Sequence, residues 1–226
     1  MISESNRPQT RRRLRSPRAA ALAGIVFSLL IGMSVILIQF SIPSVPPYEA
    51  DWLSEQAGRV SVAVTLVPFA GIAFLWFIGV IREQFGELED QFFSTVFFGS
   101  GLLFLGGLFV WMTIIASVLA SYAAAPETWI NSGAYIFGRS MIKVMGGVVT
   151  LRMAGVFMFS SGTIWLRTEV MPRWMVWITY LMALVLLIGG ASLRLLRLGF
   201  PIWVLVVSLF ILKASFQTNE DEALAG

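Results

Sequence analysis

The sequence consists largely of apolar segments that are each about as long as a membrane is thick. The first, residues 19–40, has no charged residue in 22 positions, and about 20 apolar residues are enough for a helix to cross the hydrocarbon layer. Hydrophobic residues make up 57% of the 226 and charged residues only 13%, a balance that would aggregate in water. The sequence therefore predicts an all-α, polytopic membrane protein.

We predict one bundle of six transmembrane helices with short loops, because the remaining segments are too small for a separate domain. A basic tail at 1–18 precedes the bundle, residues 19–213, and an acidic tail at 214–226 follows it. The spans are expected at about 19–40, 60–81, 93–122, 137–166, 174–193 and 198–212. The last one covers only about 22 Å at 1.5 Å per residue, so it must thin the bilayer, take in 194–199 or tuck against its neighbours.

The distribution of cations predicts the orientation. Six spans put both ends on one side, and an inside N-terminus places ten of the 16 Lys and Arg residues there, against five outside and Arg152 within the membrane. Because cytoplasmic loops are enriched in Lys and Arg, both termini are expected in the cytoplasm. The arginine cluster of 1–18 abuts an apolar segment, so we expect it to contact anionic lipid headgroups and not nucleic acid.

The sequence contains no cysteine and no histidine. This composition excludes disulfides, thiol nucleophiles, zinc sites of the Cys/His kind, His-ligated haem and catalytic arrangements that need a histidine. No metal site and no cofactor are therefore predicted.

Residues 134–166 are the unusual segment, because they read as a membrane helix that carries Arg139, Lys143 and Arg152 without an acidic residue. A buried cation in a membrane is a hypothesis for a functional site. In a structural interpretation, Arg139 and Lys143 extend to outer headgroups and Arg152 bonds to carbonyl or hydroxyl groups of nearby turns.

In a functional interpretation, the same three cations line a hydrated vestibule together with Arg194 and Arg197, and attract an anion or an anionic lipid. A third possibility is a carboxylate that reaches in from a loop, with Glu127 or Glu49 as the donor. The sequence leaves the three open.

Small residues recur every seven positions in this segment. At 100° per residue they form a continuous seam that should pack against another helix, with Lys143 on the packed side and Arg152 on a different face. The seam consists of Ser140, Gly147, Ala154 and Ser161.

The elbow at 82–93 concentrates charge between two apolar segments. Its ion pairs are expected to fix the spans, and they involve Arg82, Glu87, Glu89, Asp90 and Arg167. A proton or cation site is the alternative, but none of the six spans contains an Asp or Glu, and proton relays usually place a carboxylate or histidine at depth.

A membrane-embedded enzyme is the weakest functional hypothesis. Ser140 beside Lys143, or Ser160 with Ser161, offers a hydroxyl and an amine, but no oxyanion donor is identifiable and serine is common where helices pack.

The run LVPFAGIAFLWFIGVIREQFG at 66–86, followed by ELEDQFFSTVFFGSGLLFLGG at 87–107, resembles uncharacterised bacterial multi-pass membrane proteins with a similar apolar span, acidic elbow and small-residue span. The resemblance implies a bacterial cytoplasmic membrane and transfers no activity. We predict a non-enzymatic accessory or structural membrane protein, since no intramembrane acid or repeat is found. A small-solute or anion permeation module that uses the cations of the fourth span is the alternative. A homo-oligomer or a membrane protein partner remains open.

Overall fold

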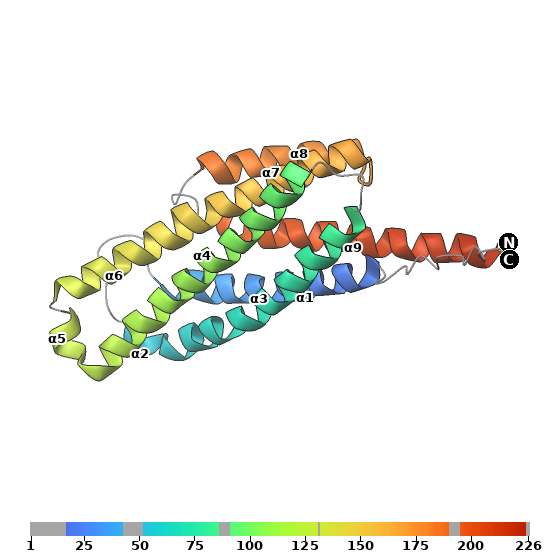
Figure 1. The fold of residues 1–226 in the computed structure, drawn as a ribbon. Helices are drawn as coiled ribbons and strands as arrows, with labels where there is room; N and C mark the ends of the chain where they lie inside the picture. Colours follow the sequence, from blue (N-terminus) through green and yellow to red (C-terminus); the bar gives the residue numbers. More distant parts are fainter. Residues whose placement is uncertain (1–16, 43–51, 86–90, 131, 190–194, 225–226) are drawn as a thin grey trace, which may run out of the picture.

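The computed structural model describes residues 17–42, 52–85, 91–130, 132–189 and 195–224, and all regular structure within them is helical. Helices of very different length follow each other along the described part of the chain (Figure 1). In order they are α1 Pro17–Ser41, α2 Trp52–Glu55, α3 Ala57–Phe85, α4 Gln91–Ala124, α5 Pro126–Ile130, α6 Gly133–Val144, the π-helix η2 Met145–Val149, α7 Thr150–Thr168, α8 Arg173–Ile188 and α9 Leu196–Leu224.

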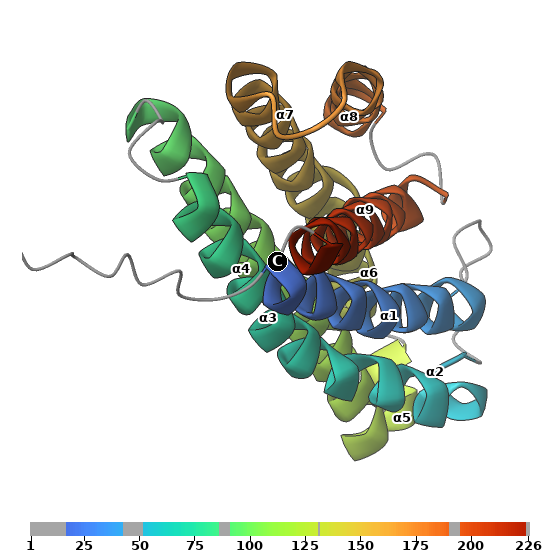
Figure 2. The same cartoon turned by 90° about the vertical axis from the view of Figure 1, so that its right-hand side faces the viewer.

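The helices alternate in direction along one long axis (Figure 1). Helix α1 begins and α9 ends at the same end of the bundle, which we call the near end; α2, α5 and the start of α6 lie at the opposite, far end. Seen from the near end, α1 lies between α3 and α9, while α7 lies beside α8 (Figure 2). Helix α4 packs on both α3 and the rod formed by α6, η2 and α7.

Five helices are long and apolar enough to cross a membrane, at 18–41, 57–82, 92–124, 133–168 and 196–216. Helix α8 is apolar but has only 16 residues. The chain is therefore a helical, multi-pass membrane protein with five such helices among the described residues, and the fifth predicted span corresponds to the shorter α8.

The last two predicted spans have different bounds in the structure. Helix α8 ends at Ile188 and not near residue 193, while α9 already begins at Leu196. Residues 198–201 are helical, with Pro201 inside α9. A proline is tolerated within a membrane helix when neighbouring helices hold it in place, and the final apolar helix thereby gains the length that its sequence pattern did not suggest.

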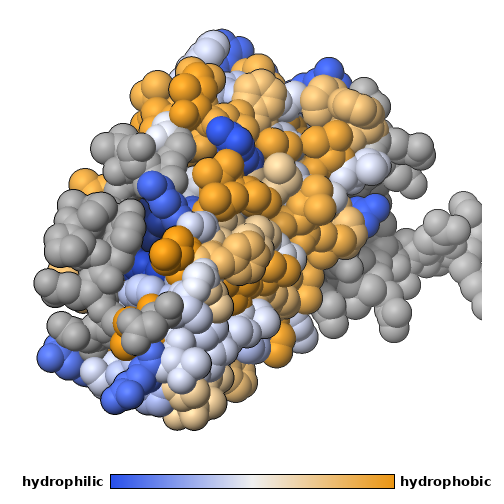
Figure 3. All heavy atoms as spheres, turned by 90° about the vertical axis from the view of Figure 1, so that its left-hand side faces the viewer, coloured by the Kyte–Doolittle hydropathy of each residue, from blue (hydrophilic) through white to orange (hydrophobic). Residues whose placement is uncertain are grey.

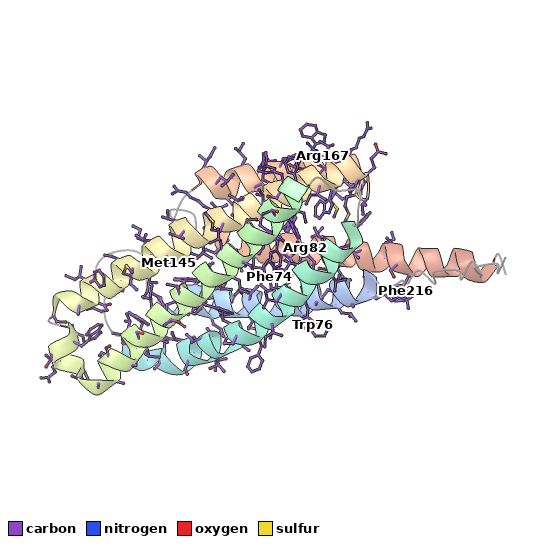
Figure 4. All side chains as sticks on the ribbon, viewed as in Figure 1. Phe74, Trp76, Arg82, Met145, Arg167 and Phe216 are labelled. Atoms are coloured by element: carbon purple, nitrogen blue, oxygen red, sulfur yellow. The ribbon has the colours of Figure 1, made fainter. Side chains whose placement is uncertain are left out.

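Five phenylalanines from α1, α3, α4, α7 and α9 meet in the interior, and we call them the phenylalanine hub: Phe27, Phe74, Phe104, Phe157 and Phe200. Figure 4 shows Phe74 at the centre, whereas Trp76 on the same helix points outward. The ring centroids of Phe27 and Phe74 are 4.7 Å apart, and those of Phe104 and Phe200 are 4.5 Å apart. These are ordinary packing distances for aromatic pairs, so the hub fills the space between the helices.

The predicted fourth span is a single rod with a π turn in its middle. Residues Met145–Val149 are π-helical, and the Thr150 hydroxyl donates a hydrogen bond of 2.8 Å to the Met145 carbonyl five residues back. Gly146 lies directly against the Trp111 ring, since a Cβ there would lie 2.3 Å from a ring carbon. Single π turns of this kind are frequent at functional sites.

Candidate functional site

Positions along α4 can be used to measure depth in the membrane, because residues 91–126 carry no charge. Near its start, Phe98 lies under the guanidinium of Arg82; near its end, Val118 touches Gly138, the neighbour of Arg139. The 20 residues between Phe98 and Val118 rise by about 30 Å, which is the thickness of the hydrocarbon layer. We therefore take these two contacts as the two edges of the apolar belt.

Arginines at the near edge pack on aromatic rings. The guanidinium of Arg82 lies 4.9 Å from the ring centroid of Phe98, and that of Arg167 lies 4.3 Å from that of Phe93. Figure 4 places Arg82 and Arg167 toward this end of the bundle. A cation over a ring is stabilised by about 0.5–1 kcal/mol at exposed sites. Both arginines thus fasten α3 and α7 to the start of α4.

The elbow acids Glu87, Glu89 and Asp90, predicted to pair with these arginines, lie outside the described residues. The ion pair found nearby joins Arg173 to Glu169 at 3.9 Å, with both side chains largely exposed. Such a pair contributes little to stability.

At the far edge, Arg139 is half-buried, with its guanidinium 5.9 Å from the ring centroid of Trp52. The Trp52 indole donates a 3.3 Å hydrogen bond to the Tyr135 hydroxyl. The short helix α2 is thereby tied to the first turns of α6. Seen from this end, hydrophilic side chains gather beside apolar surface (Figure 3), as expected where aromatic residues mark a membrane interface.

Deeper in the bundle, Arg197 contacts Trp111. Its guanidinium lies 5.4 Å from the Trp111 ring centroid, and the same indole faces Gly146 of the π turn. Trp111 is about 10 Å from the far edge along α4. Arg197 is thus held inside the apolar belt, between α9, α4 and η2. Arg194, predicted to accompany it, lies outside the described residues.

Arg152 lies at the middle of the belt on the surface. Thr150, two residues away, faces Gly107, where a Cβ would lie 3.1 Å from the Thr150 hydroxyl oxygen. Gly107 is about 14 Å from Phe98 and about 16 Å from Val118 along α4. Arg152 is exposed, and no hydrogen bond or ion pair joins it to another residue that the structure describes.

Lys143 is also exposed, about one turn inward from Arg139. The predicted packed seam is interrupted: Gly147, Ala154 and Ser161 are buried, but Ser140 is exposed. The π turn explains why Ser140 and Lys143 are both exposed, although they were predicted on the packed side of the helix. It has more residues per turn than the 3.6 of an α-helix, so the 100° rule used to align residues 140 and 143 with residue 147 fails across Met145–Val149.

The hydroxyls of the segment serve the backbone. Ser140 donates to the Ile136 carbonyl at 2.9 Å, Ser160 to Val156 at 2.8 Å and Ser161 to Phe157 at 2.8 Å. Each bond joins residues four apart, as helical serines commonly do. The described residues hold no group of three or more Asp, Glu, His or Cys that could bind a metal ion. Neither the Ser140–Lys143 pair nor the Ser160–Ser161 pair shows a hydrogen bond that would activate a serine as a nucleophile.

Two hollows lie elsewhere. A groove of about 440 Å³ between α3 and α4 has an apolar lining that includes Pro68, Phe109 and Met112. A hollow of about 350 Å³ lies at the turn between α7 and α8, lined by Trp165, Glu169 and Arg173 among others. Neither contains a cation of the fourth span.

The structure thus separates the five predicted cations. Arg139 and Arg197 lie on tryptophan rings, Lys143 and Arg152 lie on the surface, and Arg194 is not described. Sequence reasoning missed Trp52 and Trp111, because contacts between residues so far apart in the chain leave no periodic signal. Comparison with protein-family models, with curated proteins and with solved structures gives no match, so the function must be argued from this site.

Proposed function

We propose that the chain is a non-enzymatic accessory or structural protein of a membrane, built as six membrane-crossing helices with α8 as the short fifth. The phenylalanine hub is the observation that carries the proposal. Five rings from five helices close the centre of the bundle, and Phe27, Phe74, Phe157 and Phe200 are fully buried. A filled aromatic centre supports a packed scaffold in preference to a conducting path.

The positions of the cations support an orientation with both termini in the cytoplasm. Five described Lys and Arg residues lie at the near end, namely Arg18, Arg82, Arg167, Arg173 and Lys213. The far edge has Arg59, Arg139 and Lys143. Since residues 1–18 add further arginines at the near end, the positive-inside rule favours the near end as cytoplasmic. Together with the resemblance over 66–107, this supports the cytoplasmic membrane of a bacterium.

The arginine cluster of 1–18 would then face the anionic inner leaflet, where each nearby cation contributes about 1 kcal/mol of attraction. The contact of Arg18 with Phe216, 4.7 Å from guanidinium to ring centroid, supports an interfacial position for the start of α1. No cofactor enters this proposal.

An anion permeation module is the second candidate, favoured by the placement of Arg139 and Arg197 on buried tryptophans. Flux of small anions into liposomes separates the two proposals. For the scaffold we expect wild type, Lys143→Ala and Arg197→Gln all to match empty liposomes. Flux by wild type that either substitution reduces would overturn the scaffold proposal. Labelling of purified protein by a serine-directed activity probe would instead support an enzyme.

A further inference from the structure

Arg152 is the charged side chain that the proposed scaffold leaves unexplained. It lies at mid-depth of the apolar belt, on the surface, and without a hydrogen bond or ion pair to any residue that the structure describes. An arginine at the centre of a membrane helix costs about 2.5–3.5 kcal/mol on insertion scales. A group from outside the chain that neutralised it would offset this cost.

Helix α8 packs along α7 only as far as the level of Arg152. The two helices α7 and α8 are antiparallel. Gly162 faces Tyr180, and two turns nearer the start of α7, Gly155 faces Ala183 and Leu187. One more turn along α7 brings Arg152 level with the end of α8 at Ile188. Among the described residues, no helix takes the place of α8 beside the far half of the rod.

The surface around Arg152 is apolar. Val144 and Val149 on the rod and Phe159 on α7 are exposed, and Ile188 at the end of α8 is 74% exposed. We call this surface, together with Arg152, the Arg152 face. A helix from another molecule could pack on this surface, in line with α8 and beyond its end, with Arg152 at the centre of the contact.

We propose that the Arg152 face docks a membrane-spanning helix of a different protein that carries a carboxylate near its middle. This inference rests on the proposed accessory function and names the chemistry of its partner. A carboxylate on such a helix would meet the guanidinium at its own depth, in a layer where charged side chains pair with one another.

A second copy of this chain does not supply that carboxylate. The sequence has no Asp or Glu at 5–48, 56–82, 91–126, 128–168 or 170–219, and these ranges include every apolar helix of membrane length among the described residues. Pairing two copies through this face would bring arginines together. A lipid phosphate would have to enter the apolar belt to reach it, since Arg152 lies about 11 Å inside the near edge and about 19 Å inside the far edge, measured along α4 and α7.

The absence of native cysteine makes a direct test possible. Val149→Cys places one thiol about one turn from Arg152, and Val110→Cys on α4 is a control, exposed at similar depth on another helix. The probe is a synthetic leucine-rich membrane helix with a central Glu and one cysteine a turn away, or the same peptide with Gln. Disulfide formation after addition of a membrane-permeant two-electron oxidant is measured in phosphatidylcholine vesicles.

We expect the Glu peptide to cross-link Val149→Cys at least several-fold more than the Gln peptide does. Arg152→Leu should remove this preference, Arg152→Lys should keep part of it and Arg59→Leu, a control for an exposed cation elsewhere, should leave it unchanged. Val110→Cys should show no preference. Equal cross-linking of both peptides, or insensitivity to Arg152→Leu in protein that still elutes as a folded species, overturns the proposal.

Two other outcomes also overturn it. Rapid labelling of Val149→Cys by a charged, membrane-impermeant thiol reagent in vesicles without peptide would mean that water and headgroups reach Arg152. Disulfide dimers of Val149→Cys alone would assign the face to a second copy. The liposome flux assay is independent, so failure of this inference leaves the scaffold proposal intact.

Discussion

The two halves of the bundle differ in the length of uncharged helix that they present to a bilayer. In the half made of α1, α3 and α4, the distance from Arg59 to Arg82 along α3 is about 34 Å, and α4 is uncharged over its whole length of about 51 Å. In the half made of α7, α8 and α9, the distance from Arg152 to Arg167 is about 22 Å, α8 measures about 24 Å and Arg197 to Lys213 spans about 24 Å.

One half of the bundle thus matches a hydrocarbon layer of about 30 Å, whereas the uncharged helix of the other half is too short for it. The long half supplies most of the phenylalanine hub and needs nothing further to fill the membrane. The short half leaves a deficit of about 6–8 Å, and the cations Arg152 and Arg197 lie at its border. We expect the long half to determine stability and the short half to determine what the protein binds.

The largest effect is expected at the hub in the long half. Phe74→Ala removes a fully buried ring that contacts four other hub rings, so we expect a loss of about 3 kcal/mol or more in stability. Phe69→Ala on the same helix, where the ring is exposed, is the control. Thermal unfolding in detergent measures both, and similar melting temperatures would mean that the hub does not hold the bundle together.

A smaller loss is expected at the buried seam of α7. Ala154 is fully buried, so Ala154→Leu forces a larger side chain into a filled contact at a cost of about 1–3 kcal/mol. Val156→Leu, at a half-buried position of the same helix, should cost much less. Equal melting temperatures of the two variants would mean that the buried seam is not a tight helix contact.

The link between α8 and α9 should contribute about 1 kcal/mol. The Trp203 indole donates a buried 2.9 Å hydrogen bond to the Thr179 hydroxyl, and polar bonds between membrane helices average about 0.6 kcal/mol, with larger values when a donor is left unpaired. Thr179→Val should lower the melting temperature slightly, whereas Thr179→Ser, which keeps the hydroxyl, should recover most of it. Full stability of the valine variant would show that α8 is held by apolar packing alone.

The smallest effect is expected at the near edge. Arg82→Gln removes the cation over Phe98 and should cost about 0.5–1 kcal/mol. Arg59→Gln, at an exposed position of the same helix, should cost nothing measurable. An equal effect of both substitutions in detergent would attribute it to net charge and not to the ring.

Hydropathy alone predicted the helical class and placed four of the spans within a few residues of the observed helices. The ends of α8 and α9 were missed because Gly199 and Pro201 are poor helix formers, while packing on α1 and α8 holds that stretch helical. The candidate site was predicted only in part. Arg152 stands out in the sequence because it is a cation in an apolar segment, but its exposure depends on where α8 ends, which no local pattern encodes.

The π turn at Met145–Val149 has a consequence for any shortening of the chain. A π turn takes up one residue beyond the α-helical repeat, so deleting one residue there returns the rod to α geometry while the segments on both sides keep their faces. Deleting Val148 would therefore leave α7 and the phenylalanine hub in place and keep Tyr135 and Arg139 toward Trp52. A one-residue deletion in the regular helix of α6 would instead rotate the segment before it by about 100° and separate the far end from α2.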